Sequence, residues 1–145
     1  MRTDVKINFL TPIFPMNPDT NFSTLKHVLA QEQDLDFAVL IGSRAEGNAR
    51  PESDWDIALR WKEKPDFMDT FAAQETLRRK MQLALSVAED KIDLIDLHRP
   101  SLVMRANVAE RGIVLTGEAS LAWAHFLNRT WRELEYYYWD EQHAA

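Results

Sequence analysis

A glycine–serine turn between two apolar segments constrains the fold of this chain more than any other feature. The turn, Gly42–Ser43, follows the apolar run 37–41, which reads as a buried strand. Ten residues separate Ser43 from Asp54, and Asp54 and Asp56 open the next apolar segment. Residues i and i+2 of a strand point to the same face, so this spacing places the two carboxylates side by side. The pattern predicts two neighbouring strands that bring a serine-bearing turn close to a pair of acids.

These residue types in this order favour chemistry on phosphate groups. Two adjacent carboxylates repel each other, and one or two divalent cations would relieve that repulsion. The turn can offer backbone N–H groups and the Ser43 hydroxyl to phosphate oxygens. A pair of metal ions beside a phosphate cradle is typical of nucleotidyl transfer. The glycine loop lacks the Gly-Lys-Ser/Thr sequence of a P-loop, so a P-loop nucleotide site is not indicated.

Composition excludes several other classes of protein. The 145 residues are 46% apolar, which fits one domain, residues 1–145, with a real core. A net charge of −6 makes direct nucleic-acid binding a poor expectation, because such binding needs many Lys and Arg facing phosphates. Without an apolar run of about 18 residues, no membrane span is expected, and the first residues are not expected to form a secretory signal. With no cysteine present, a cytoplasmic protein without membrane attachment is the expectation.

Hydrophobic periodicity predicts a small mixed α/β (α+β) domain, a small mixed β-sheet flanked by helices. Residues 1–21 read as an irregular arm with a short strand at 5–9, and a helix capped by Ser23 follows to about residue 33. A long helix begins at Pro65–Asp66, with Phe67 and Phe71 on its apolar face together with Leu77, Met81, Leu85 and Ala88. The expected strands are 37–41, 55–61 and 91–97, with a short apolar segment at 113–115, and the remaining helices are 102–112 and 119–142.

A third acid is expected from the strand at 91–97. Asp93 and Asp96 lie in an otherwise apolar run, where a carboxylate is costly unless it is paired, hydrogen-bonded or bound to a metal. Asp93 follows the entry of the strand and could lie beside Asp54 and Asp56, so we favour it over Asp96. The alternative is that one of these acids pairs with an arginine or caps the following loop.

The roles of other residues near these acids can be interpreted in two ways. Arg44 and Arg50 could reach a triphosphate oxygen, or could be ordinary loop residues that are solvated or paired with neighbouring glutamates. His98 could contact a substrate, although a loop histidine is the better interpretation. Trp55 sits between the two aspartates and is expected to point away from them into the core.

The C-terminal helix, within residues 118–145, holds seven of the fifteen aromatic residues. One apolar stripe of this helix is Leu121, Ala124, Leu127, Trp131, Leu134 and Tyr138, and a second group, Trp123, Phe126 and Tyr137, widens it. A helix this apolar must bury more than one face. Either all of it packs on the sheet, or part of it is a docking surface for another protein, since aromatic residues are enriched at interface hot spots.

Taken together, these motifs resemble those of the polymerase β-like nucleotidyltransferases. The resemblance covers residues 36–117 and rests on Gly-Ser, ten residues, Asp-x-Asp, and the strand Lys-Ile-Asp-Leu-Ile-Asp-Leu that contains Asp93. Ser53 before Asp54 and Gly47 in the loop also fit. At this size the chain is most similar to the minimal nucleotidyltransferase (MNT) group, whose members are typically antitoxins of HEPN–MNT toxin–antitoxin pairs.

The resemblance implies a site and a reaction. Gly42 and Ser43 would hold the triphosphate of ATP, and Asp54, Asp56 and Asp93 would bind Mg²⁺, with two ions expected. AMP would then pass to a tyrosine of a partner HEPN toxin, whose RNase activity would be shut off. Two alternatives stay open: transfer to a small molecule of the aminoglycoside type, and a non-catalytic antitoxin that masks the toxin by binding it.

Overall fold

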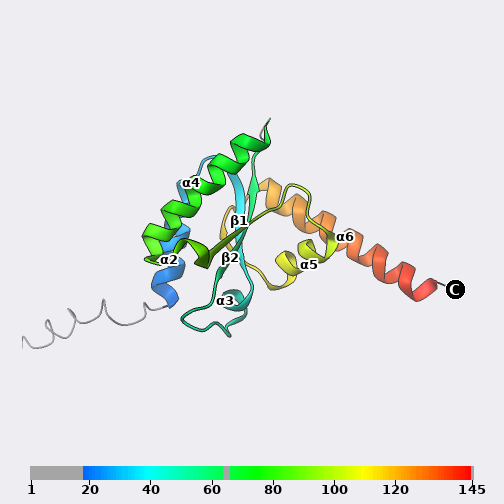
Figure 1. Ribbon diagram of the computed structural model, residues 1–145. Helices are drawn as coiled ribbons and strands as arrows, with labels where there is room; N and C mark the ends of the chain where they lie inside the picture. Colours follow the sequence, from blue (N-terminus) through cyan, green and yellow to red (C-terminus); the bar gives the residue numbers. More distant parts are fainter. Residues whose placement is uncertain (1–17, 64–65, 145) are drawn as a thin grey trace, which may run out of the picture.

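The computed structural model describes residues 18–63 and 66–144 (Figure 1). Along the chain the elements are α2 (Pro18–Ala30), β1 (Leu35–Ile41), α3 (Ser43–Glu46), β2 (Trp55–Trp61), α4 (Phe67–Leu85), the 3₁₀ turn η2 (Glu89–Lys91), β3 (Ile92–Asp96), α5 (Leu102–Arg111), β4 (Ile113–Thr116) and α6 (Leu121–His143). Within these residues, no helix has an apolar stretch long enough to cross a bilayer.

The sheet is mixed, as the sequence predicts. Its strands lie in the order β3-β2-β1-β4. β1 runs antiparallel to both β2 and β4, whereas β2 and β3 are parallel. A parallel pair needs a crossover connection, and α4 supplies it. The end of β1 therefore meets the beginnings of β2 and β3 at one edge of the sheet.

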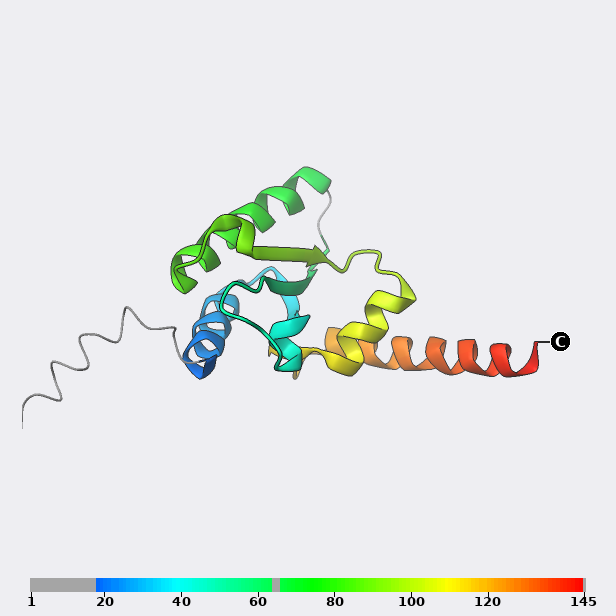
Figure 2. The same ribbon diagram turned by 60° about the horizontal axis from the view of Figure 1, so that its bottom comes forward.

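Helices cover both faces of this sheet (Figures 1 and 2). Alternate residues of β2 point to opposite sides, so Trp55, Ile57 and Leu59 pack toward α2 and α4 while Ala58 packs toward the other layer. On the α5 and α6 side, Phe37 of β1 makes edge-to-face contacts with two aromatic rings of α6, those of Trp123 and Phe126. Each layer thus has its own apolar core.

The second half of α6 projects away from the sheet as a long rod (Figure 2). Its buried residues are Trp123, Phe126, Thr130 and Leu134, spaced three or four apart on one helical face. Beyond Leu134 the aromatic side chains are exposed. The expectation that all of this helix packs on the sheet is therefore wrong.

Two details of the sequence-based assignment need correction, and a third lies outside the described residues. The first described helix begins at Pro18, so Ser23 lies inside it and is not its cap. This start is reasonable, because proline is tolerated in the first turn of a helix. Phe67 and Phe71 stack on each other at the exposed beginning of α4 and do not join the core. The strand predicted at residues 5–9 lies outside the described residues.

The apolar stripe of this helix and the group that widens it are buried to different extents. Leu121 is 70% exposed and Trp131 is 40% exposed, whereas Trp123 and Phe126 are buried. The difference in burial comes from tertiary packing, because Phe37 of β1 contacts the side of α6 that carries Trp123 and Phe126. The sequence alone does not distinguish that side, since the stripe and the group that widens it are similarly apolar.

Candidate active site

The turn after β1 has a backbone conformation that only glycine adopts easily. Gly42 has φ 77° and ψ −160°, and Ser43 follows as the first residue of the short helix α3. The carbonyl oxygen of Gly42 accepts hydrogen bonds from the N–H groups of Ala45 and Glu46, which tightens the turn. Ser43 is consequently held at the end of β1, half-buried, as the sequence predicts.

Asp56 lies directly against this turn. A Cβ atom added to Gly42 would come within 2.4 Å of Oδ2 of Asp56, so the carboxylate occupies the space that a side chain would need. The strand register explains the contact, because Asp56 pairs with Ile41, the residue before Gly42. The same register places Asp56 beside Asp93 of β3. The serine-bearing turn and two of the predicted acids therefore meet at one edge of the sheet.

Asp54, Asp56 and Asp93 influence one another electrostatically. The pKa of Asp56 is raised, first by burial and then by repulsion from the carboxylates of Asp93 and Asp54. Asp56 is half-buried, whereas the other two acids are exposed to solvent. Asp54 precedes β2 and Asp93 lies on β3. Arg44 interacts electrostatically with Asp54, and the repulsion that acts on Asp56 favours binding of a cation.

The donor set fits Mg²⁺, which prefers carboxylates, waters and phosphate oxygens. The three acids do not form a complete protein cage: across residues 18–63 and 66–144, no group of three His, Cys, Asp or Glu side chains is close enough together to hold a metal ion. The expectation that the acids converge closely enough to share ions is therefore not met among the described residues. Asp54 and Asp93 lie near enough to Asp56 to raise its pKa, but the three side chains do not form a metal-binding group. Mg²⁺ usually keeps several waters and takes further ligands from substrate phosphates, so such an open set is compatible with it.

Asp96 has a different role from Asp93. Its Oδ1 atom accepts a hydrogen bond of 3.0 Å from the backbone N–H of His98, which caps the loop after β3. It pairs with Leu59, at the other end of the parallel ladder from the Asp56–Asp93 pair. The alternative that the sequence left open, an acid that caps the following loop, describes Asp96.

Arg44 holds the loop between β1 and β2 together. Its guanidinium donates to the carbonyl oxygen of Ser53 at 2.8 Å and to that of Pro51 at 3.2 Å. It also lies 4.1 Å from the ring centroid of Trp55, which is buried as predicted. Of the two readings of Arg44, the structure supports a loop residue, although its partners are backbone carbonyls and not neighbouring glutamates. This clamp fixes the segment that presents Asp54.

The contact between Gly42 and Asp56 leads to a prediction with a matched control. Gly42→Ala should reduce catalytic activity strongly, because the new Cβ must displace the Asp56 carboxylate, and should destabilise the fold by about 1–2 kcal/mol or more through its positive φ. Gly47 is the matched control: it has a similar φ of 82°, but a Cβ atom added to it would meet nothing within 4 Å. Thermal melts and rates of transfer measured on both variants separate the loss of stability caused by the positive φ from the loss of activity caused by displacing Asp56. Equal losses of activity in the two variants would contradict a specific role for the Gly42–Asp56 contact.

A second group of charged side chains, at the other end of β2, was missed by the sequence analysis. Arg60, Arg105 and Arg129 line one cavity together with the loop after β3, where His98 lies in an exposed position. These arginines come from β2, α5 and α6, so no local sequence pattern connects them. Only the packing of the helices on the sheet brings them together.

Comparison with known proteins identifies the relatives of this chain. A family model described as "Polymerase beta, Nucleotidyltransferase" matches residues 23–120. A search of curated proteins finds no match.

Among solved structures, a toxin–antitoxin crystal structure with AMP-PNP aligns with a TM-score of 0.60 and 24% identity, over 88% of this chain and 94% of the other. A tri-AMPylated HEPN toxin in complex with its MNT antitoxin, from Shewanella oneidensis, aligns with a TM-score of 0.60 and 23% identity, over 87% of this chain and 93% of the other. At these identities the alignments show a shared fold.

Proposed function

Because this chain belongs to the polymerase β nucleotidyltransferase family, we propose that it transfers AMP from ATP to a tyrosine of a HEPN toxin and thereby neutralises the toxin. The observation that carries this proposal is the contact between Gly42 and the carboxylate of Asp56, with Asp93 beside it on the next strand. It unites the phosphate-binding turn and the acids at one edge of the sheet.

Each residue of this edge has a role in the proposed reaction. Gly42 and Ser43 hold the triphosphate through backbone N–H groups and the serine hydroxyl. Asp54, Asp56 and Asp93 would hold Mg²⁺, which would neutralise phosphate charge and lower the pKa of the attacking hydroxyl. The tyrosine oxygen forms a bond to the α-phosphorus, the bond to the leaving pyrophosphate breaks, and Asp93 accepts the phenol proton.

The structural relatives support both the nucleotide and the acceptor. One of them contains the ATP analogue AMP-PNP, and another contains a toxin that carries three AMP groups. A further relative, 23% identical, carries glutamate in place of two aspartates that are separated by one residue, the spacing of Asp54 and Asp56 here.

The exposed aromatic residues of α6 favour a protein as the partner. Tyr136, Tyr137, Tyr138 and Trp139 are between 54% and 74% exposed on the projecting half of the helix. Exposed aromatic side chains are enriched at the hot spots of protein interfaces. The same surface would also serve a masking antitoxin, so masking is the second candidate function. A small-molecule acceptor of the aminoglycoside type remains an alternative, and mass spectrometry of the partner distinguishes it from a protein acceptor.

The proposal is tested by mass spectrometry of a HEPN protein that is co-expressed with this chain. We expect one or more adenylate masses on a tyrosine of the partner, and labelling of the purified partner by [α-³²P]ATP only when Mg²⁺ is present. A partner that is bound and inhibited without any added mass would support masking and contradict transfer. Labelling that persists in EDTA would contradict the role of the metal.

A further inference from the structure

A basic cavity lies on the α5 and α6 side of the sheet. Its volume is about 490 Å³. Its lining contains no acidic residue. Six basic side chains line it: Arg60, Arg99, Arg105, Arg129, His98 and His125. Such a concentration of arginines is unexpected in a chain whose net charge is −6, so the cavity is a candidate for recognising an anion.

This cavity is separate from the candidate active site. Asp56, Ala58 and Arg60 point to the same face of β2, and four residues of strand span roughly 13 Å. Arg60 pairs with Phe37 near the beginning of β1, whereas Asp56 pairs with Ile41 at its end. A ligand at Arg60 therefore lies on the same face as the acids but at the opposite end of the strand.

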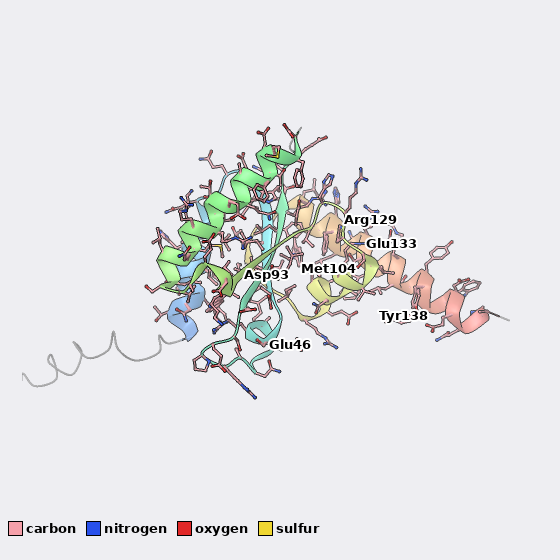
Figure 3. The ribbon with its side chains drawn as sticks, in the orientation of Figure 1. Glu46, Asp93, Met104, Arg129, Glu133 and Tyr138 are labelled. Atoms are coloured by element: carbon pink, nitrogen blue, oxygen red, sulfur yellow. The ribbon has the colours of Figure 1, made fainter. Side chains whose placement is uncertain are left out.

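The arginines are held in place by bonds within the protein. Nη1 of Arg60 donates to the carbonyl oxygen of Leu97 at 3.1 Å, which fixes the guanidinium beside the loop after β3. Arg105 of α5 forms an ion pair with Glu133 of α6, and Arg129 reaches the other oxygen of the same carboxylate at 3.4 Å. Figure 3 shows Arg129 and Glu133 next to each other on α6.

The charge of this cluster is not balanced by its neighbours. Glu133 is the acid that pairs with these arginines, and these hydrogen bonds, the one from Arg105 above all, lower its pKa. The cavity has four guanidinium groups, and this one carboxylate balances one of them. Three positive charges are left in excess when both histidines are counted as neutral. In addition, the side chain of Arg105 is only 11% exposed, and its buried Nη1 atom has no hydrogen-bond partner among the described residues. A bound acceptor oxygen would supply the partner that this buried donor needs.

We propose that this cavity binds the phosphate group of a nucleotide, as a second anion site separate from the acids. Arginine guanidinium groups match phosphate oxygens in a two-pronged geometry, and a cavity of this volume accommodates a small organic ligand. The phosphate has two possible sources, a free nucleotide and a nucleotide already joined to an acceptor. Binding at this site requires neither Mg²⁺ nor transfer, so it is independent of the proposed reaction.

The test uses the full chain with the Asp56→Asn substitution, which removes one carboxylate of the proposed metal site and leaves the cavity unchanged. Calorimetric titration in EDTA at low salt compares four probes: inorganic phosphate, AMP, the 5′-phosphorylated diadenylate pApA, and acetate. We expect phosphate-bearing probes to bind, and a double variant with Arg99→Gln and Arg129→Gln to bind them at least 10-fold more weakly. Both arginines are exposed, so these changes spare the core.

The control is Arg79→Gln, an exposed arginine of α4 on the opposite layer, which should leave affinity unchanged. Preference for pApA would identify the nucleotide already attached to an acceptor as the ligand, and equal binding of AMP would identify a free nucleotide. The proposal is overturned if no phosphate probe binds, if acetate binds equally well, or if the double variant binds like the control. Failure here would leave the adenylation of a partner by the wild-type chain unaffected, so the two proposals fail separately.

Discussion

Asp56→Asn is expected to abolish adenylate transfer while raising the thermal stability of the fold. The loss of activity should be on the order of 10³-fold, because the change removes one of the carboxylates that would hold the Mg²⁺ needed to neutralise charge at the reacting phosphate. The gain in stability follows from the raised pKa of Asp56, since burial and the charges of Asp93 and Asp54 disfavour its ionised form. Asparagine is similar in shape and carries no charge. We expect a rise in Tm of about 1–3 °C at neutral pH.

The pH dependence has a definite sign. A carboxyl whose pKa is higher in the folded than in the unfolded protein binds its proton more tightly when folded. Its contribution to stability is therefore greatest at acid pH and falls as pH rises through the raised pKa. The difference in Tm between Asp56→Asn and the wild type should thus be largest at neutral pH and shrink on acidification. Mg²⁺ should raise the Tm of the wild type more than that of the variant.

A matched pair of variants on β3 tests which further acid belongs to the site. Asp93→Asn should lose transfer to a similar extent as Asp56→Asn, whereas Asp96→Asn should keep it, because Asp96 accepts a hydrogen bond from His98 and caps a loop. Rates of [α-³²P]AMP incorporation, with circular dichroism to verify folding, decide the matter. Near-normal transfer by both Asp56→Asn and Asp93→Asn would refute the assigned roles.

The sequence predicts the strands of this site well because their signals are local. The predicted strand 55–61 matches β2, and the acid preferred on the third strand, Asp93, is the one that lies beside Asp56. The apolar runs predict the strands, and the acids within them mark the site, since a charge inside a strand is costly unless it is paired, hydrogen-bonded or bound to a metal. The contact between Gly42 and Asp56 depends on strand register, which the local pattern does not give.

Features that depend on packing between distant segments could not be predicted. The basic cavity combines residues from position 37 to position 129, and Arg105 of α5 forms an ion pair there with Glu133 of α6. The face of α6 that packs is chosen by Phe37, almost ninety positions earlier in the chain. Likewise, the clamp formed by Arg44 uses backbone carbonyls, which any residue provides, so no sequence signal distinguishes it from a solvated arginine.

If the proposed HEPN partner docks on α6, Trp131→Ala and Trp139→Ala are each expected to weaken its binding by about 30-fold, because truncating an aromatic hot-spot residue costs about 2 kcal/mol or more. Both side chains lie on the part of α6 that carries the exposed aromatic surface, and they are 40% and 59% exposed. Figure 3 shows Tyr138 on the same projecting stretch, away from the sheet. Isothermal titration with the purified partner measures the change.

A second exposed aromatic residue gives the control for this surface. Phe67 is 77% exposed at the beginning of α4, on the opposite layer, so Phe67→Ala removes an aromatic ring without touching α6. Trp139→Ala and Phe67→Ala should melt within about 1–2 °C of the wild type, since both side chains are more than half exposed. Circular dichroism verifies the folding of Trp131→Ala, whose side chain is more than half buried. Unchanged partner affinity in both tryptophan variants would show that the toxin docks elsewhere. A tryptophan variant that binds the partner more weakly and no longer adenylates it, but still binds ATP with Mg²⁺ normally, would show that α6 serves docking. The chemistry would then belong to the acids.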